Sequence, residues 1–147
     1  MRSKITELDL PALEQIRTLK SRYLRFVDTR DWDALASLFT DDAELEPAGT
    51  GAGGRPPVVL GPSAIVNWIR NGLLNAQSIH HCFMPDISLT ASDRACGIWA
   101  MEDRISWPDR SLHGFGYYHD RYVRQHGIWL IAASRLERTK ITINKAR

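Results

Sequence analysis

One aspartate and two histidines are the residues of this sequence best suited to chemistry. Asp28 stands where the first run of regularly spaced apolar residues stops, and His80 and His81 are adjacent farther along the chain. Carboxylates and imidazoles transfer protons near neutral pH, since a free imidazole has a pKa of about 6.5. Adjacent strand histidines suit chelation poorly, and the sequence holds no HExxH motif, cysteine cluster or two-histidine, one-carboxylate spacing. The pattern gives no support for a metal site and favours acid–base chemistry.

The element expected to carry Asp28 is a helix over about residues 10–30. Its apolar residues recur every three or four positions, and Pro11 suits a first helical turn. Tyr23 and Val27 lie within the apolar arc, whereas Asp28 lies roughly 100° beyond Val27, at the edge of the buried face. Position alone therefore favours a solvated helix-end aspartate, and Tyr23 suits the core as well as a site.

The rest of the pattern predicts one α+β domain over residues 1–147. Two further helices are expected over 32–39 and 61–75, with a mobile Gly/Pro-rich loop at about 47–57. Short strands are expected at 43–46 and 58–60, and four long ones at 78–90, 94–107, 112–125 and 128–143. We therefore expect a curved, mostly antiparallel sheet (a cone or half-barrel), with three N-terminal-half helices covering its concave face around a pocket and a flexible tail at about 142–147.

Pairing the long strands across their turns assigns one sheet face to the pocket. It places Asp103 opposite Gly116, Met101 opposite Tyr118, and Tyr118 opposite Ser134. Unless a β-bulge swaps the faces, the inward residues are Trp99, Met101, Asp103, Gly116, Tyr118, Ala132 and Ser134. Small residues leave room, so Trp99, Met101, Tyr118 and Ser134 are candidate substrate-binding residues. A lone buried carboxylate is costly unless paired, which makes Asp103 hard to explain as structure.

The opposite face of the sheet is expected to be exposed or to form a subunit contact. It carries Tyr117 and Trp129 among its residues.

Composition and charge exclude several partners. The net charge is +2, from 19 basic and 17 acidic residues, so no strong field favours nucleic acid, and the basic residues near the C-terminus are expected to be solvated. No apolar run is long enough for a signal peptide or a membrane span. Cys82 and Cys96 lack CxxC spacing and are expected to be free, buried thiols. We expect a cytoplasmic protein.

The order of elements, together with five short motifs, resembles the SnoaL-like branch of the nuclear-transport-factor-like cone fold. The motifs are Tyr23-x4-Asp28-x-x-Asp31, then 38–43, 61–65, His80-His81 before Ile87, and 117–120 before Gly127-Ile128-Trp129. That superfamily includes scytalone dehydratase, bile-acid dehydratase, hexachlorocyclohexane dehydrochlorinase, ketosteroid isomerase, limonene epoxide hydrolase and polyketide cyclases. Fold alone does not choose among these activities.

The resemblance implies that Asp28 and His80 act as a pair. The dehydratases and the dehydrochlorinase share an acidic residue at the end of the first long helix and a histidine on the strand after the third. The bile-acid dehydratase pattern adds Tyr23 and Asp103. His80 is preferred over His81 because its distance to Ile87 fits better. The dehydrochlorinase's pocket arginine has no secure counterpart; Ser134 takes its place, with Arg135 and Arg138 as alternatives.

The function implied is a cofactor-independent lyase or isomerase, dehydratase-like, acting on a small hydrophobic cyclic compound. His80 would remove a proton, Asp28 would hold the imidazole, and Tyr23 or Asp103 would hydrogen-bond the departing oxygen or the developing enolate. The alternatives are a non-catalytic ligand-binding or assembly module of the same fold, or an activity of the polyketide-cyclase or epoxide-hydrolase type. The resemblance implies a homo-oligomer, a dimer or trimer, whichever of these functions applies. No nucleic-acid or membrane partner is expected.

Overall fold

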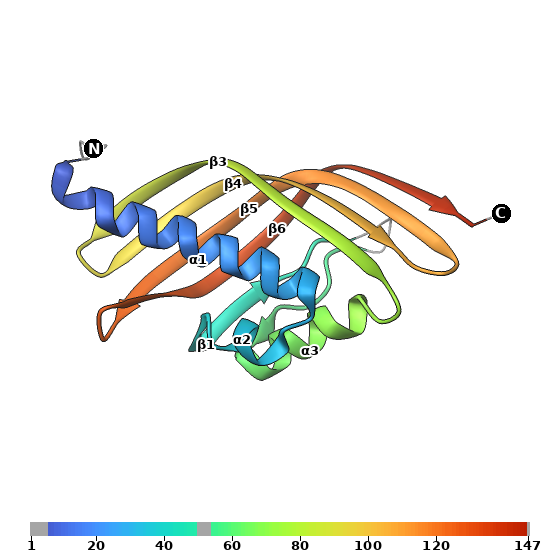
Figure 1. Cartoon of the computed structure of the whole chain (residues 1–147), viewed down its shortest axis with the longest axis horizontal. Helices are drawn as coiled ribbons and strands as arrows, with labels where there is room; N and C mark the ends of the chain where they lie inside the picture. Colours follow the sequence, from blue (N-terminus) through green and yellow to red (C-terminus); the bar gives the residue numbers. More distant parts are fainter. Residues whose placement is uncertain (1–5, 50–53, 147) are drawn as a thin grey trace.

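The computed structural model describes residues 6–49 and 54–146. A short 3-10 turn, η1 (Glu7–Asp9), precedes α1 (Leu10–Thr29) and α2 (Trp32–Ala36). The remaining elements are β1 (Phe39–Glu46), β2 (Val59–Leu60), α3 (Pro62–Gly72), β3 (Gln77–Ala91), β4 (Arg94–Ser106), β5 (Arg110–Gln125) and β6 (Ile128–Lys145) (Figure 1). The expected α+β order is confirmed. None of the helices in these ranges is long and apolar enough to cross a membrane.

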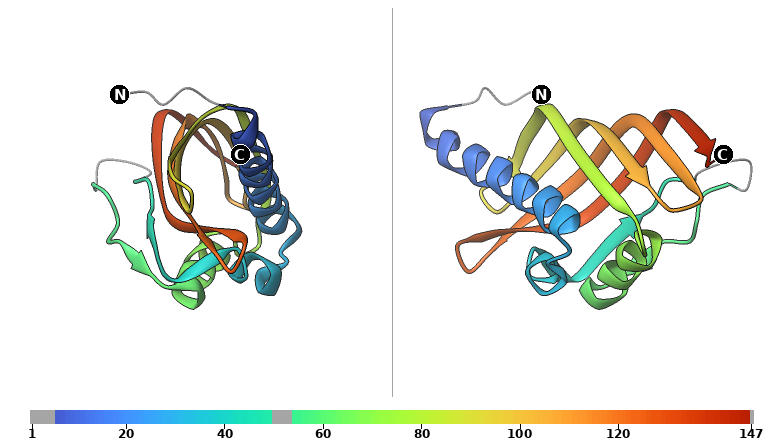
Figure 2. Two further views of the ribbon diagram at one scale, coloured as in Figure 1. Left: turned by 90° about the vertical axis from the view of Figure 1, so that its left-hand side faces the viewer. Right: turned by 45° about the vertical axis from the view of Figure 1, so that its right-hand side comes forward.

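All six strands form one curved, unclosed sheet in the order β2-β1-β6-β5-β4-β3. Strands β3 to β6 form an antiparallel meander, and β1 joins β6 in parallel and β2 antiparallel. Figure 2 shows the sheet curling into a half-barrel, with α1 along its open side and α2 and α3 together near one end. The expected cone with helices on its concave side is confirmed.

Helix α1 packs one face into the half-barrel and ends at Thr29. Its inward residues include Ile16, Tyr23 and Val27, each at most 5% exposed. Arg30 then adopts a left-handed conformation (φ 62°), and its N–H bonds to the carbonyls at the helix end. Asp28 therefore lies in the last turn, beside the start of β3.

The register between β4 and β5 differs from the expected one by two residues. Asp103 lies opposite Gly114, and Met101 opposite Gly116, because the hairpin turns over residues 107–109 and Ser106 already pairs with Ser111. Side chains alternate along a strand, so a shift of two keeps each on its predicted face. The inward set is accordingly buried: Trp99, Met101, Asp103, Tyr118 and Ser134 are each at most 6% exposed.

A β-bulge in β6 reverses one predicted assignment. Arg121 pairs with Ala133, but Tyr122 pairs with Ile131, so Ala132 is the extra residue. The alternation of faces changes there, and Trp129 points into the core, 5% exposed. Its expected place on the outer face is wrong.

The C-terminal residues and the loop after β1 also differ in part from expectation. Strand β6 reaches Lys145, which lies opposite Arg110, so residues 142–145 belong to the sheet rather than to a flexible tail. In the expected mobile loop, residues 50–53 lie outside the described residues. Beyond them, Arg55 Nη1 donates to the carbonyl of Leu136 on β6 at 3.2 Å.

The two cysteines are free, but only one is shielded. Cys82 is partly buried, and burial raises its thiol pKa to about 11, whereas Cys96 is exposed, contrary to the expected buried position. We predict that iodoacetamide at neutral pH alkylates Cys96 and spares Cys82, since the thiolate is the reactive form. Peptide mass mapping measures this, with urea-unfolded protein as the control in which both react. Equal labelling of both in the folded protein would contradict the prediction.

Candidate active site

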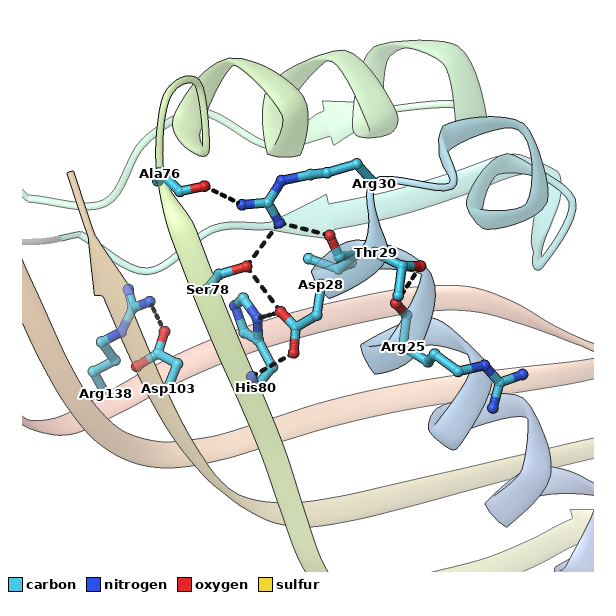
Figure 3. Close-up of polar contacts among 10 residues, drawn as sticks. Arg25, Asp28, Thr29, Arg30, Ala76, Ser78, His80, Asp103 and Arg138 are labelled. Atoms are coloured by element: carbon cyan, nitrogen blue, oxygen red, sulfur yellow. Dashed lines mark hydrogen bonds and ion pairs between the residues drawn. The ribbon is translucent and has the colours of Figure 1, made fainter. Parts of the chain in front are cut away.

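Asp28 and His80 lie in direct contact where the end of α1 meets the start of β3. His80 Nδ1 is 2.6 Å from Asp28 Oδ1, and the His80 backbone N–H donates to Asp28 Oδ2 at 2.8 Å (Figure 3). Both carboxylate oxygens thus hold the same histidine. A carboxylate only accepts, so Nδ1 carries the proton and Nε2 keeps a free lone pair.

Two further residues help to hold the Asp28 carboxylate in place, Ser78 by direct contact and Arg30 through Ser78. Ser78 Oγ donates to Asp28 Oδ1 at 2.8 Å, and Arg30 Nη1 donates to Ser78 Oγ at 2.7 Å. The same guanidinium donates to the carbonyl of Ala76 at 2.6 Å (Figure 3). It also donates to the carbonyl of Val27 at 2.7 Å. Arg30 therefore ties the end of α1 to the start of β3, and the relative position of Asp28 and His80 is set by backbone as well as side-chain bonds.

The electrostatic balance keeps Asp28 ionised. Burial pulls its pKa upward, but hydrogen bonds from the His80 imidazole, the His80 N–H and Ser78 outweigh burial, so the pKa lies below its ordinary value. The ionised carboxylate therefore stabilises the folded protein at a pH above the unfolded-state pKa of an aspartate, about 3.9. This stabilisation is lost as the pH falls through the lower pKa that Asp28 has in the folded state.

We predict that Ser78→Ala raises the pH at which the protein unfolds in acid, because it removes one bond that lowers the Asp28 pKa. Circular dichroism during an acid titration measures the midpoint. Ser88→Ala is the matched control, because Ser88 is exposed on the same strand. A Ser78→Ala midpoint equal to that of the wild-type protein would disprove the assignment.

A cavity of about 420 Å³ opens beside His80. Its wall is mostly apolar, and its polar groups come from Tyr23, Asn71, His80, Tyr118 and Arg138. The apolar lining includes Val27, Leu45, Trp68, Ile69, Leu73, Ile105, Trp107, Leu112 and Leu136. A few convergent polar groups in an apolar wall are characteristic of small-molecule sites.

Asp103 and Arg138 form a second charged pair next to the histidine. Arg138 Nη2 donates to Asp103 Oδ2 at 2.5 Å, and Asp103 lies opposite His80 in the β3–β4 pairing (Figure 3). The Asp103 side chain is fully buried, while Arg138 is 9% exposed and lines the cavity. Gly114 leaves the space for this pair, since a Cβ there would lie 2.4 Å from Asp103 Oδ1.

The structure brings together only some of the predicted site residues. Tyr23, His80 and Tyr118 line the cavity, with Asp28 behind His80. Trp99, Met101 and Ser134, expected to bind substrate, are buried but do not line it. Trp99 and Ser134 instead belong to a hydrogen-bonded cluster deeper in the core, around Asp120 and Tyr122.

The pocket arginine is Arg138, one of the two alternatives to Ser134, and its expected solvated position is wrong. Its place could have been found by continuing the strand alternation four residues beyond Ser134. Ser78 shares the inward face with His80 by the same rule. Arg30 was missed because nothing local in the sequence indicates a left-handed residue whose side chain turns back to β3.

The match to a known family decides the fold. Residues 9–135 match the model of the SnoaL-like domain, which is most of the chain. The chain belongs to the SnoaL-like family. The resemblance inferred from its sequence motifs is thereby confirmed, and the dyad, the cavity and the arginine lie within the matched domain or at its C-terminal border.

Solved structures show how widely this SnoaL-like fold is shared. A hexachlorocyclohexane dehydrochlorinase, LinA Type2, superposes with a TM-score of 0.82 at 24% identity, over 97% of this chain and 94% of that one. A scytalone-dehydratase-like protein from Novosphingobium aromaticivorans gives 0.82 at 20% identity over the same shares. ActVI-ORFA from Streptomyces coelicolor gives 0.70 at 15% identity, over 88% and 98%. At these identities the likeness concerns the fold.

Proposed function

We propose that this chain is a cofactor-independent lyase or isomerase in which His80 removes a proton from a small hydrophobic cyclic substrate. One observation carries the proposal: His80 lines an apolar cavity, and its Nδ1 is bonded to the ionised carboxylate of Asp28. This bond leaves Nε2 as the basic atom toward the ligand. Positioned proton transfer of this kind accelerates a reaction by about 10² to 10⁴-fold.

In an elimination, the C–H bond breaks and its electron pair forms the new double bond. The leaving group departs with the electrons of its own bond, and the proton passes to His80 Nε2. The imidazolium that forms is stabilised by the Asp28 carboxylate at 2.6 Å. In an isomerisation, the same proton returns to a different carbon.

Charge developing on the leaving group or on an enolate oxygen needs a donor. Arg138 is the cationic group of the cavity, and the hydroxyls of Tyr23 and Tyr118 are neutral donors. Asp103, expected from the sequence to act directly, is instead fully buried against Arg138 and does not line the cavity. We assign it the role of holding that guanidinium.

The size and lining of the cavity support the substrate class. About 420 Å³ lies near the lower end of the range for small-molecule sites, which suits a ring compound of modest size. The neighbouring structures described as a dehydrochlorinase and as scytalone-dehydratase-like concern eliminations by name, which supports the same class of reaction.

The test is a turnover screen with hydroxylated and halogenated cyclic compounds, including sterols, terpenoid alcohols and halocyclohexanes. Products are followed by mass spectrometry, and solvent deuterium reveals proton abstraction without net reaction. Alkene formation or deuterium exchange supports the proposal. Cyclised products or diols would point to the polyketide-cyclase or epoxide-hydrolase alternatives, and tight binding with neither turnover nor exchange would point to a ligand-binding module.

We also propose that the chain forms a homo-oligomer through the outer face of the sheet. Exposed apolar side chains lie there, among them Phe83, Ile98 and Tyr117. Large exposed apolar patches favour association. Light scattering should therefore give a mass of at least twice 16.7 kDa, and Tyr117→Lys should lower it. A monomer at micromolar concentration would refute this.

A further inference from the structure

A buried ion pair that the proposed chemistry does not use lies beneath the site. Lys20 Nζ is 2.8 Å from Asp120 Oδ2, and the two side chains are 1% and 0% exposed. The Asp120 carboxylate also accepts from Ser134 at 2.6 Å and from Tyr122 at 2.8 Å. Its oxygens are thus fully engaged, and the pair is enclosed between α1, β5 and β6.

The ammonium of Lys20 also contacts the aromatic wall of the cavity. Nζ lies 3.6 Å from the ring centroid of Tyr118 and 4.7 Å from that of Tyr23. Both rings line the cavity. A buried ion pair adds little net stability compared with apolar residues, because desolvation offsets the attraction. Stability alone therefore does not explain why a lysine occupies the apolar face of α1.

The Tyr118 hydroxyl is the group on which this cation can act. Among the described residues it has no hydrogen-bond partner, and it is not one of the polar atoms sealed off from solvent. Burial raises the pKa of Tyr118 well above its ordinary value, so the phenol stays protonated. A cation on the ring face attracts π-electron density and so strengthens the hydroxyl as a donor.

We propose that Lys20 is a positioning residue that holds the Tyr118 ring and polarises its hydroxyl as the donor to the group that gains negative charge in the cavity. The expected effect on turnover rests on the proposed function, whereas the expected effect of Lys20 on the Tyr118 hydroxyl does not. Asp120 makes the pair neutral overall, yet the ammonium is the member stacked on the ring. The ionisable groups around the ammonium are Asp120, Tyr118, Tyr23 and Cys82. Those around the Tyr118 phenol are Tyr23 on α1, Cys82 on β3, Asp103 on β4 and Arg138 on β6, and none of these is changed in the test below.

The test replaces Tyr118 with difluorotyrosine, whose phenol titrates at lower pH, and follows its absorbance during a pH titration. The ion pair is removed in two ways, by Lys20→Gln with Asp120→Asn and by Lys20→Met with Asp120→Leu. Both leave no unpaired charge, and the Gln/Asn pair also nearly keeps the volume, so either one that folds carries the test. We expect the fluorophenol pKa to rise by roughly one pH unit when the ion pair is removed.

Tyr122→Phe is the matched control. It removes one bond to Asp120 and the acceptor of the Trp99 indole N–H, but leaves the contact between Lys20 and Tyr118. It should destabilise the protein and leave the fluorophenol pKa unchanged. An unchanged fluorophenol pKa in the folded variants without the ion pair overturns the inference.

Kinetics on a compound that is turned over give the second readout. Removing the ion pair should lower kcat roughly tenfold when Tyr118 is present and have no further effect in Tyr118→Phe. An equal loss in both backgrounds overturns the inference, since it would mean a purely structural effect. The titration needs no substrate, so the two proposals can fail separately. If no compound of the panel is turned over or exchanged, while the fluorophenol pKa still rises when the ion pair is removed, the proposed function alone is refuted.

Discussion

Replacing His80 with alanine should lower turnover by at least about 100-fold while the protein stays folded. Among the described residues that line the cavity, His80 carries the one side chain that is a base near neutral pH, so no other lining residue can take the proton from the substrate. Its removal leaves Asp28 with its bond to the backbone N–H of residue 80 and to Ser78, so the helix end stays attached to β3. Steady-state rates on the compound found by the screen, together with thermal melting, measure both effects.

His81→Ala is the control for that substitution. It removes the same side chain one residue away, but His81 points out of the sheet and is exposed. We expect its turnover to stay within twofold to threefold of the wild-type rate, as for surface changes in general. If His80→Ala kept most of its activity, or if His81→Ala lost as much, the assignment of the base would be wrong.

Replacing Asp103 with leucine should destabilise the protein by about 3 kcal/mol, the lower end of the cost of breaking a buried ion pair. The leucine leaves the Arg138 guanidinium without its partner in a wall where the Arg138 side chain is only 9% exposed. The lower end applies because Arg138 borders the cavity and can regain some water there. Urea denaturation with a constant m-value measures the change.

The paired variant separates stability from function. Adding Arg138→Met to Asp103→Leu removes the stranded charge, so most of the lost stability should return. Turnover should not return, because the cationic group of the cavity is gone. Recovery of turnover together with stability would show that Arg138 serves the fold and not the reaction.

The fold was predictable because its signals are local and repeated. The apolar spacing of α1 and the alternation along four long strands determine which face each side chain takes, and a register error of two residues left those faces unchanged. The bulge at Ala132 was not predictable, since nothing in its immediate sequence marks an unpaired residue. It therefore displaced Trp129 from the predicted outer face to the core.

The site was only partly predictable, because contacts between distant segments follow from the fold and not from spacing. Asp28 and His80 were paired through resemblance, and the helix pattern alone favoured a solvated aspartate. Lys20 was overlooked, although a lysine among Leu19, Tyr23 and Val27 breaks the apolar face of α1 and marks a buried charge. That break was a usable signal for the ion pair with Asp120.

The position of His80 on β3 has a consequence for solubility. Strand β3 is the last strand of the sheet, and the free edge of such a strand is a template for pairing with another chain. At His80 the backbone N–H is already occupied by the Asp28 carboxylate, and α1 lies along that side of the sheet (Figure 1). The carboxylate and the helix therefore both hinder the addition of another strand at this point. Loss of Asp28 would free this one N–H while α1 still lies along the edge, so variants that remove the oxygen acceptor should aggregate only slightly more than the wild-type protein.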